Sequence, residues 1–209
     1  LPFSGFLCGC GTYLRQGDEI LMHHTISGKR CEEIPVILKE CNAGMVLEGT
    51  DNVYFTAEPS RFKDLEQTRA HFAAVGVGLA ETAETKGIIY DKLCIVTDTQ
   101  SDVERMYREF EQEFDIMDRR GGFYELVPLG YSKGTAVEYV LKQYGLTKED
   151  AYVFGDSSND LAMIQKAGLG VAMGNAQPPV KAAANYLTAD NDHDGVGLAV
   201  EKFILNEET

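Results

Sequence analysis

Short apolar segments alternate with helical patterns in the last third of the sequence, and this alternation constrains the fold more than any other feature. Apolar segments suited to buried strands occupy residues 151–156, 169–174 and 186–189. Helical patterns precede, separate and follow them, at 132–145, 159–168, 178–185 and 194–204. Strands and helices in strict alternation form a parallel sheet covered by helices. The sequence therefore predicts an α/β core.

The middle of the chain has a different pattern of predicted elements, in which paired strands are mixed with helices. Hairpins are predicted with turns at 15–18 and 50–52, and a further strand–turn–strand unit at 115–128. Helices are predicted over 28–44, 59–76 and 101–114, the last begun by a capping box of Ser101 and Glu104. We therefore predict an α/β core made of residues 1–20 and 125–209, interrupted by an inserted α+β domain at 21–124.

Charge and composition exclude several classes of protein. The 209 residues carry a net charge of −14, which argues against nucleic acid or an anionic membrane surface as a partner. The longest apolar runs are too short to span a membrane. An odd number of cysteines favours reduced thiols and a cytoplasmic location; they are Cys8, Cys10, Cys31, Cys41 and Cys94. Cys8 and Cys10 lack a second pair at zinc-finger spacing, so we expect them to be small buried residues.

Polar residues cluster where the strand at 151–156 ends. Asp156 follows Gly155, and Asp160 lies four residues further on, where a helix begins. Ligands in open parallel sheets bind beyond the carboxyl ends of the strands, and a helix N-terminus favours anions. Two carboxylates at such a place suggest Mg²⁺ beside a phosphate. The alternative is that Asp156 or Ser157 only caps the helix. Lys133, about twenty residues upstream, could neutralise a phosphoryl group.

At these residues the sequence resembles a known family. The segment 132–203, which contains "SKGTAVEYV" and "VFGDSSNDLAMIQKAGLGVAMGNA", resembles the C-terminal half of Cof-type phosphatases, subfamily IIB of the haloacid dehalogenase-like superfamily. The hairpin and helix section resembles the large cap of that family. The segment "SGFLCGCGTYL" resembles its strand after the second motif, although Cys10-Gly11 stands where the family usually has Asn-Gly.

The resemblance implies a role for each polar residue of this segment. Lys133 would steady the phosphoryl group and the attacking carboxylate, as a catalytic and substrate-binding residue. Asp156 would ligate Mg²⁺, and Asp160 would support the metal shell and act in catalysis. Asn159 would face the phosphate, and Gly174 and Asn175 would shape the loop behind the metal. The implied fold is a Rossmann-like parallel sheet with an inserted α+β cap.

The resemblance also implies a part that the sequence lacks. The family's reaction begins with an aspartate in a pattern Asp-x-Asp-Gly-Thr, which attacks phosphorus and forms an aspartyl-phosphate. No such pattern precedes the segments that resemble the family, because the sequence begins at Leu1, without a methionine. We therefore expect the core to be incomplete at the N-terminus and this fragment alone to be inactive. The alternative is a catalytically inactive protein that binds a phosphorylated ligand or a metal.

Two patterns near the C-terminus compete with this interpretation. Residues 192–195 read Asp-His-Asp-Gly, but no buried strand ends there. The same stretch satisfies the calcium-loop spacing with Asp190, Asp192, Asp194, Gly195 and Glu201. The segment that enters it is short and strand-like, whereas that loop needs a helix on each side. A solvated acidic loop is the better interpretation. The full-length protein is thus expected to be a Mg²⁺-dependent phosphatase of small phosphorylated metabolites such as sugar phosphates.

Overall fold

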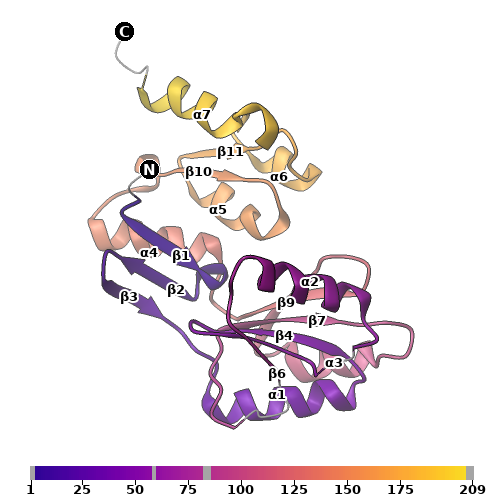
Figure 1. Cartoon of the computed structure of the whole chain (residues 1–209). Helices are drawn as coiled ribbons and strands as arrows, with labels where there is room; N and C mark the ends of the chain where they lie inside the picture. Colours follow the sequence, from indigo (N-terminus) through magenta and orange to yellow (C-terminus); the bar gives the residue numbers. More distant parts are fainter. Residues whose placement is uncertain (1–2, 58–59, 82–85, 206–209) are drawn as a thin grey trace. The chain divides into compact units, whose positions relative to one another are not determined.

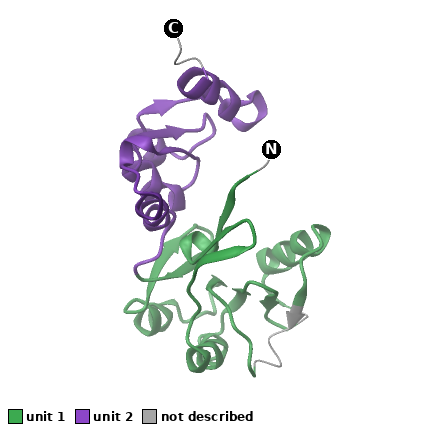
Figure 2. Cartoon of the chain, turned by 90° about the vertical axis from the view of Figure 1, so that its left-hand side faces the viewer, with its two compact units in different colours: residues 1–129 green, residues 130–209 purple. Residues whose placement is uncertain are grey.

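The computed structural model describes residues 3–57, 60–81 and 86–205 of the chain (Figure 1). The chain divides into two compact units, Leu1–Leu129 and Gly130–Thr209, which Figure 2 colours separately.

The second unit is built on a parallel sheet. Strands β10 (Tyr152–Gly155), β11 (Leu169–Ala172) and β12 (Tyr186–Leu187) lie side by side in this order and run parallel. The helices of this unit are α4 (Lys133–Tyr144), α5 (Leu161–Lys166), α6 (Pro178–Ala183) and α7 (Gly195–Val200), the last continued by a π-helical turn, Glu201–Leu205. Ile164, Ala172 and Val180 form the centre of its core. The predicted alternation of strands and helices is confirmed.

Helix α4 owes its position to its two ends and to one small residue. Ser132 caps its N-terminus in a capping box with Thr135, and Gly145 ends it in the left-handed conformation with φ +65°. A Cβ atom on Gly134 would lie 2.7 Å from the backbone of Ala162. Glycine therefore allows α4 to approach α5 closely and places Lys133, the first residue of α4, beside the start of α5.

The first unit contains a six-stranded, mainly antiparallel sheet in the order β6-β5-β4-β7-β9-β8. Its strands are β4 (Gly44–Glu48), β5 (Val53–Phe55), β6 (Leu79–Glu81), β7 (Lys92–Val96), β8 (Phe114–Asp118) and β9 (Phe123–Pro128). Its helices are α1 (Gly28–Glu40), α2 (Lys63–Ala74) and α3 (Val103–Phe110). The hairpin with its turn at 50–52 and the strand pair at 115–128 are confirmed, and so is the α+β character of this section.

Alternate residues of each strand contribute to different apolar clusters. Met45 and Leu47 pack in one cluster with residues of α1 and α3, whereas Val46 packs in another with residues of α2. Successive side chains of a strand point to opposite faces of the sheet. The helices therefore cover both faces, α1 and α3 on one and α2 on the other.

A three-stranded antiparallel sheet precedes these elements: β1 (Gly5–Cys8), β2 (Tyr13–Gln16) and β3 (Glu19–His23). The predicted turn at 15–18 is confirmed, since β2 and β3 are joined at residues 17–18. The burial expected for Cys8 and Cys10 is wrong. Cys8, the last residue of the edge strand β1, is exposed, and Cys10 is half-buried in the following turn. None of the five cysteines, all within the described residues, forms a disulfide.

One predicted cap is also wrong. The N-cap of α3 is Asp102, whose side chain accepts a hydrogen bond from the backbone N–H of Arg105. Ser101 instead donates its hydroxyl to the carbonyl of Asn42 at 2.7 Å, which ties the end of α1 to this loop. Because a tertiary partner takes Ser101, the neighbouring acid becomes the cap.

The compact units differ in extent from the predicted domains, since residues 1–20 belong to the first unit and the division falls after Leu129. The assignment of residues 1–20 to an α/β core stays a prediction. Among the described residues, no helix is both long and apolar enough to cross a membrane.

Candidate functional site

The loop between β10 and α5 holds three of the four predicted site residues. Asp156 directly follows β10, and residues 158–160 form a single 3₁₀ turn that leads into α5. The backbone carbonyl of Asp156 accepts a hydrogen bond from the N–H of Gln177, in the loop after β11. The loops that follow two neighbouring parallel strands therefore meet at one edge of the sheet, where ligands bind in folds of this class.

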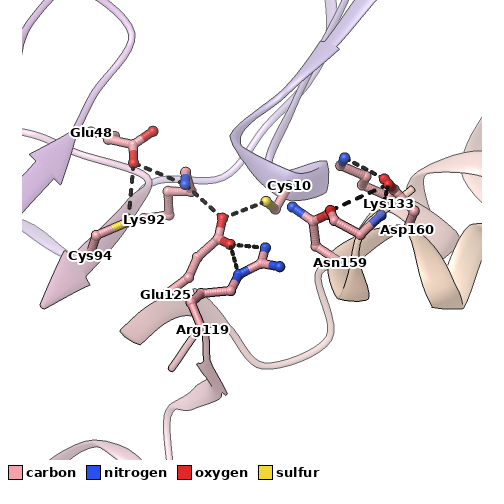
Figure 3. Close-up of polar contacts among 10 residues, drawn as sticks. Cys10, Glu48, Lys92, Cys94, Arg119, Glu125, Lys133, Asn159 and Asp160 are labelled. Carbon is pink, nitrogen blue, oxygen red and sulfur yellow. Dashed lines mark hydrogen bonds and ion pairs between the residues drawn. The ribbon is translucent and has the colours of Figure 1, made fainter. Parts of the chain in front are cut away.

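Asp160 is the centre of this site. Its side chain is buried, with 3 % of the residue exposed, and both of its carboxylate oxygens have partners. Oδ2 accepts the backbone N–H groups of Asp156 at 2.9 Å and Ser157 at 3.0 Å. Oδ1 accepts a hydrogen bond from Nζ of Lys133 at 2.5 Å (Figure 3). Asp160 therefore fixes the backbone that carries Asp156 and at the same time orients Lys133.

Glycine at position 155 makes this arrangement possible. A Cβ atom there would lie 2.5 Å from Cβ and 3.0 Å from Cγ of Asp160. Only a residue without a side chain lets the buried carboxylate approach the end of β10 so closely. Packing against Asp160 thus explains the glycine that precedes Asp156.

The electrostatics of Asp160 favour its charged form. Burial raises the pKa of this carboxyl, but the hydrogen bond from Lys133 and those from the backbone N–H groups of Ser157 and Asp156 outweigh it. The net result is a pKa below the ordinary value. Asp160 is therefore an ionised, fully engaged carboxylate that acts on its neighbours through hydrogen bonds and charge.

Asp156 has a contrasting environment. Its side chain is exposed, and Oδ2 accepts a hydrogen bond from Nδ2 of Asn175 at 3.3 Å. Asn175 is itself held by the backbone N–H of Asn191, which donates to its Oδ1 at 3.2 Å. An accessible carboxylate fixed at the end of a strand is a suitable ligand for a hard divalent cation.

Asn159, the fourth predicted residue, contacts Ser157. The hydroxyl of Ser157 donates to Oδ1 of Asn159 at 2.6 Å. The loop thus brings Lys133, Asp156, Asn159 and Asp160 together within one unit. Sequence reasoning did not assign Ser157 a partner; the only signal for one was the density of short polar residues in "GDSSND".

In the acidic stretch at 190–194, the polar side chains form hydrogen bonds within the stretch itself. Oδ1 of Asp190 accepts hydrogen bonds from Nδ1 of His193 and from the backbone of Asp192. Asp194 adopts a left-handed conformation and precedes α7 directly. Within the described residues, no group of three or more histidine, cysteine or acidic side chains is arranged to hold a metal ion.

A second polar cluster, which the sequence analysis did not identify, lies in the first unit. Lys92 of β7 pairs with Glu48 of β4 at 2.9 Å and with Glu125 of β9 at 2.8 Å, and Arg119 pairs with the other oxygen of Glu125 (Figure 3). Cys10 donates its thiol to Glu125. The signal was present in the sequence, because Lys92 begins and Glu125 interrupts a strand that is otherwise apolar.

This cluster shifts the pKa of Glu125 strongly. Burial alone would raise the pKa, but the charge of Lys92 and hydrogen bonds from Cys10, Lys92 and Arg119 lower it from 4.5 to about 2. Burial likewise disfavours the charged form of Lys92, yet the nearby carboxylates raise its pKa above the ordinary value. The buried charges therefore compensate one another.

Comparison with known proteins places the chain in a family. A family model described as haloacid dehalogenase-like hydrolase matches residues 3–200. The chain is 44% identical over 94 residues to the 5-amino-6-(5-phospho-D-ribitylamino)uracil phosphatase YcsE of Bacillus subtilis, an alignment that covers 45% of this chain and 38% of that protein. The chain thus spans well under two thirds of this relative.

Solved structures with the same fold support the match. A haloacid dehalogenase-like hydrolase from Bacteroides thetaiotaomicron superposes with a TM-score of 0.75 at 25% identity, covering 91% of this chain and 73% of that one. A subclass IIB sugar phosphatase, BT4131, superposes with a TM-score of 0.77 at 22% identity, covering 96% of this chain and 75% of that one. The second similarity concerns the fold alone.

Proposed function

Because the chain belongs to the haloacid dehalogenase-like hydrolases, we propose that the full-length protein is a Mg²⁺-dependent phosphatase of small phosphorylated metabolites. The observation that carries this proposal is the contact between Lys133 and Asp160, which holds a cationic side chain beside the loop of Asp156. A cation and an accessible carboxylate at the carboxyl edge of a parallel sheet suit a phosphoryl group and a metal ion.

Lys133 and Asp160 would have different roles: Lys133 would bind negative charge, and Asp160 would position Lys133. Lys133, whose side chain is 30% exposed, can reach a phosphoryl oxygen from its place at the N-terminus of α4. There its charge would offset the negative charge that increases during transfer. Asp160 would keep the lysine and the loop in place, and Asn159 would contribute a further contact to the phosphate.

Asp156 is the residue that would hold Mg²⁺ directly. Mg²⁺ commonly keeps several waters and is bound by one or two carboxylates together with substrate phosphates, so one exposed carboxylate fits this ion. Asp160 would contribute to the metal shell through hydrogen bonds, since its oxygens are already engaged. When bound, Mg²⁺ would neutralise phosphate charge.

The proposed reaction also needs a nucleophile. In our proposal this is an aspartate outside the 209 residues, which would form an aspartyl-phosphate, and the fragment alone would be inactive. The pattern at 192–195 is a poor substitute, because it forms a 3₁₀ turn before α7 and does not end a strand.

The name of one relative suggests the substrate class. That relative is a phosphatase of a phosphoribityl compound, so phosphate monoesters of sugars and sugar alcohols are the first candidates. In this proposal the α+β section at 21–124 acts as a cap that selects the substrate, and the enzyme acts in the cytoplasm.

The test is phosphate release by the full-length protein from a panel of sugar phosphates and polyol phosphates, with Mg²⁺ or with EDTA. Mg²⁺-dependent release that is lost in Asp156→Asn would support the proposal. Tight binding of a phosphorylated compound without release would instead identify a catalytically inactive binding protein.

A further inference from the structure

The first unit contains a pocket of about 390 Å³. Part of its lining comes from the small sheet of β1 and β2. Phe6 pairs with Arg15 and Cys8 pairs with Tyr13 across these antiparallel strands, so the four side chains share one face of the sheet. All four line the pocket. This part of the lining therefore combines two aromatic rings with a guanidinium group.

Another part of the lining comes from the hairpin of β4 and β5 and from the start of β7. Glu48 ends β4, Gly49 and Thr50 belong to the turn that follows, and Asp91 directly precedes β7. The backbone N–H of Asp91 donates to the carbonyl of Glu48 at 2.9 Å, which joins the two segments. This part therefore supplies two carboxyl groups and one hydroxyl group.

Asp91 is a buried acceptor that its neighbours hold in place. Only 5% of the residue is exposed. Nε2 of His23 lies 3.0 Å from Oδ1 and 3.2 Å from Oδ2, and the hydroxyl of Thr50 lies 3.5 Å from Oδ2. The ring of His23 packs edge-on against Tyr13, with 5.1 Å between the centroids. These two partners supply at most one hydrogen each, whereas a carboxylate accepts about four. Asp91 can therefore accept further hydrogen bonds from a ligand.

Glu48 also retains acceptor capacity. Among the described residues, its side chain makes its contacts through Oε1, to Nζ of Lys92 at 2.9 Å and to Sγ of Cys94 at 3.4 Å (Figure 3). Oε2 can accept a hydrogen bond from a ligand. Because Lys92 offsets the charge of Glu48, the pocket is not a site of unbalanced negative charge.

Arg15 adds hydrogen-bond donors to the same pocket. Its Nε donates to the carbonyl of Gly17 at 2.6 Å, and its Nη2 donates to Asp18 at 3.0 Å. A guanidinium group has five N–H donors, so Arg15 retains donors for a ligand while its contacts with the turn fix its position. The pocket thus offers acceptors and donors together with aromatic surface.

We propose that this pocket binds a neutral polyhydroxylated compound, a sugar or a sugar alcohol. Its hydroxyl groups would donate to Asp91 and Glu48 and accept from Arg15. Its C–H groups would pack against the rings of Phe6 and Tyr13. The volume suits such a ligand, since small-molecule sites measure about 300–1,000 Å³.

Other classes of ligand fit the lining less well. An anion would meet two carboxyl groups, and an apolar ligand would cover those groups without giving them partners. In the described parts of the chain, no group of three or more histidine, cysteine or acidic side chains is arranged to hold a metal ion. A diamine would be repelled by Arg15 and Lys92. A neutral polyol is the class that satisfies both the acceptors and the donors.

The test is an NMR titration of the ¹⁵N-labelled full-length protein with sorbitol and with glucose. We expect saturable shifts of the backbone amides of Gly49, Thr50 and Asp91, with a dissociation constant on the order of 1 mM. Absence of saturable shifts at these amides would overturn the inference. Tighter binding of 1,5-diaminopentane than of sorbitol would identify a site for cations and would also overturn it.

Two variants test the lining directly. Asp91→Asn should weaken sorbitol binding by at least about tenfold, because hydrogen bonds to a charged acceptor are lost. Phe6→Ala should weaken it by about two- to tenfold, and the fold should persist because 56% of Phe6 is exposed. The matched controls are Asp115→Asn and Tyr144→Ala, which change an exposed acid and an exposed aromatic residue elsewhere. Unchanged sorbitol affinity of Phe6→Ala would refute the proposal even if Asp91→Asn does not fold.

Kinetics distinguishes two sources of the polyol, and either outcome supports the pocket. Competitive inhibition of phosphate release by sorbitol would identify the ligand as the unphosphorylated part of a substrate. Binding of sorbitol without inhibition would identify a separate ligand. The inference does not rest on the proposed function, because sorbitol and glucose carry no phosphate. If the protein releases no phosphate, the proposed function fails, and the titration still decides whether the pocket binds a polyol.

Discussion

Lys133 and Asp160, 27 positions apart in the sequence, are joined by a hydrogen bond of 2.5 Å between Nζ and Oδ1. The contact requires Gly134, which lets the helix of Lys133 approach α5, and Gly155, which leaves space for the buried acid. Two glycines thus bring together the cation and the carboxylate of the candidate site.

Removal of the cation is expected to affect turnover more than binding. In the full-length enzyme, Lys133→Ala should lower kcat by about 10²–10³-fold, because one group that stabilises the transferred charge is lost. KM should change by less than about threefold. Steady-state kinetics on a sugar phosphate measures both. Lys166→Ala is the matched control, because Lys166 pairs with Glu138 on the surface. A loss confined to KM would assign Lys133 to ground-state binding.

Neutralisation of the exposed carboxylate should abolish metal dependence without unfolding the protein. Asp156→Asn is expected to reduce turnover by at least about 100-fold, because Asn is a weaker ligand for Mg²⁺ than a carboxylate. Activity is measured across a range of Mg²⁺ concentrations, and circular dichroism checks the fold. Asp115→Asn, which removes an exposed acid of β8, serves as the control for net charge. Wild-type turnover of Asp156→Asn at saturating Mg²⁺ would contradict its assignment as a ligand.

Addition of one methyl group at the end of β10 should destabilise the second unit. Gly155→Ala would place Cβ 2.5 Å from Cβ of Asp160, so the strand or the buried acid must move. We expect the free energy of unfolding to fall by about 1–3 kcal/mol, measured by urea denaturation. Gly28→Ala, at the start of α1, meets no atom within 4 Å and should change stability by less than about 1 kcal/mol. Equal effects of the two substitutions would argue against the close packing.

The cluster around Glu125 predicts a specific loss of stability in acid. The pKa of Glu125 is lowered to about 2 in the folded protein, so its contribution to stability is present above pH 4.5, its ordinary pKa, and is lost as the pH falls towards 2. The lost contribution is on the order of 3 kcal/mol.

Urea denaturation between pH 7 and pH 2.5 tests this prediction. Glu125→Gln should be less stable than the wild type at pH 7 and should show a smaller decrease between pH 4.5 and 2.5. Glu32→Gln, an exposed acid of α1, should follow the wild-type curve. Parallel curves for Glu125→Gln and the wild type would show that Glu125 titrates normally in the folded state.

Local pattern was sufficient to predict most secondary structure in this chain. The apolar segments at 151–156 and 169–174 form neighbouring strands of a parallel sheet, and the loop that begins at Asp156 follows the first of them. The position of Asp156 was predictable for the same reason, since it depends only on where a strand ends. The cap of α3 was not predictable, because Ser101 has a better partner in Asn42, far away in the sequence.

The sequence by itself determined the α/β and α+β character of the two sections and the residue types of the candidate site. Only the tertiary structure decided the partners: Lys133 with Asp160, Ser157 with Asn159, and Lys92 with Glu48 and Glu125. The physical reason is that periodicity records which face of an element is buried, whereas a hydrogen bond depends on distances between elements. Those distances are set by packing, at Gly134 and Gly155 above all, and packing depends on the whole unit.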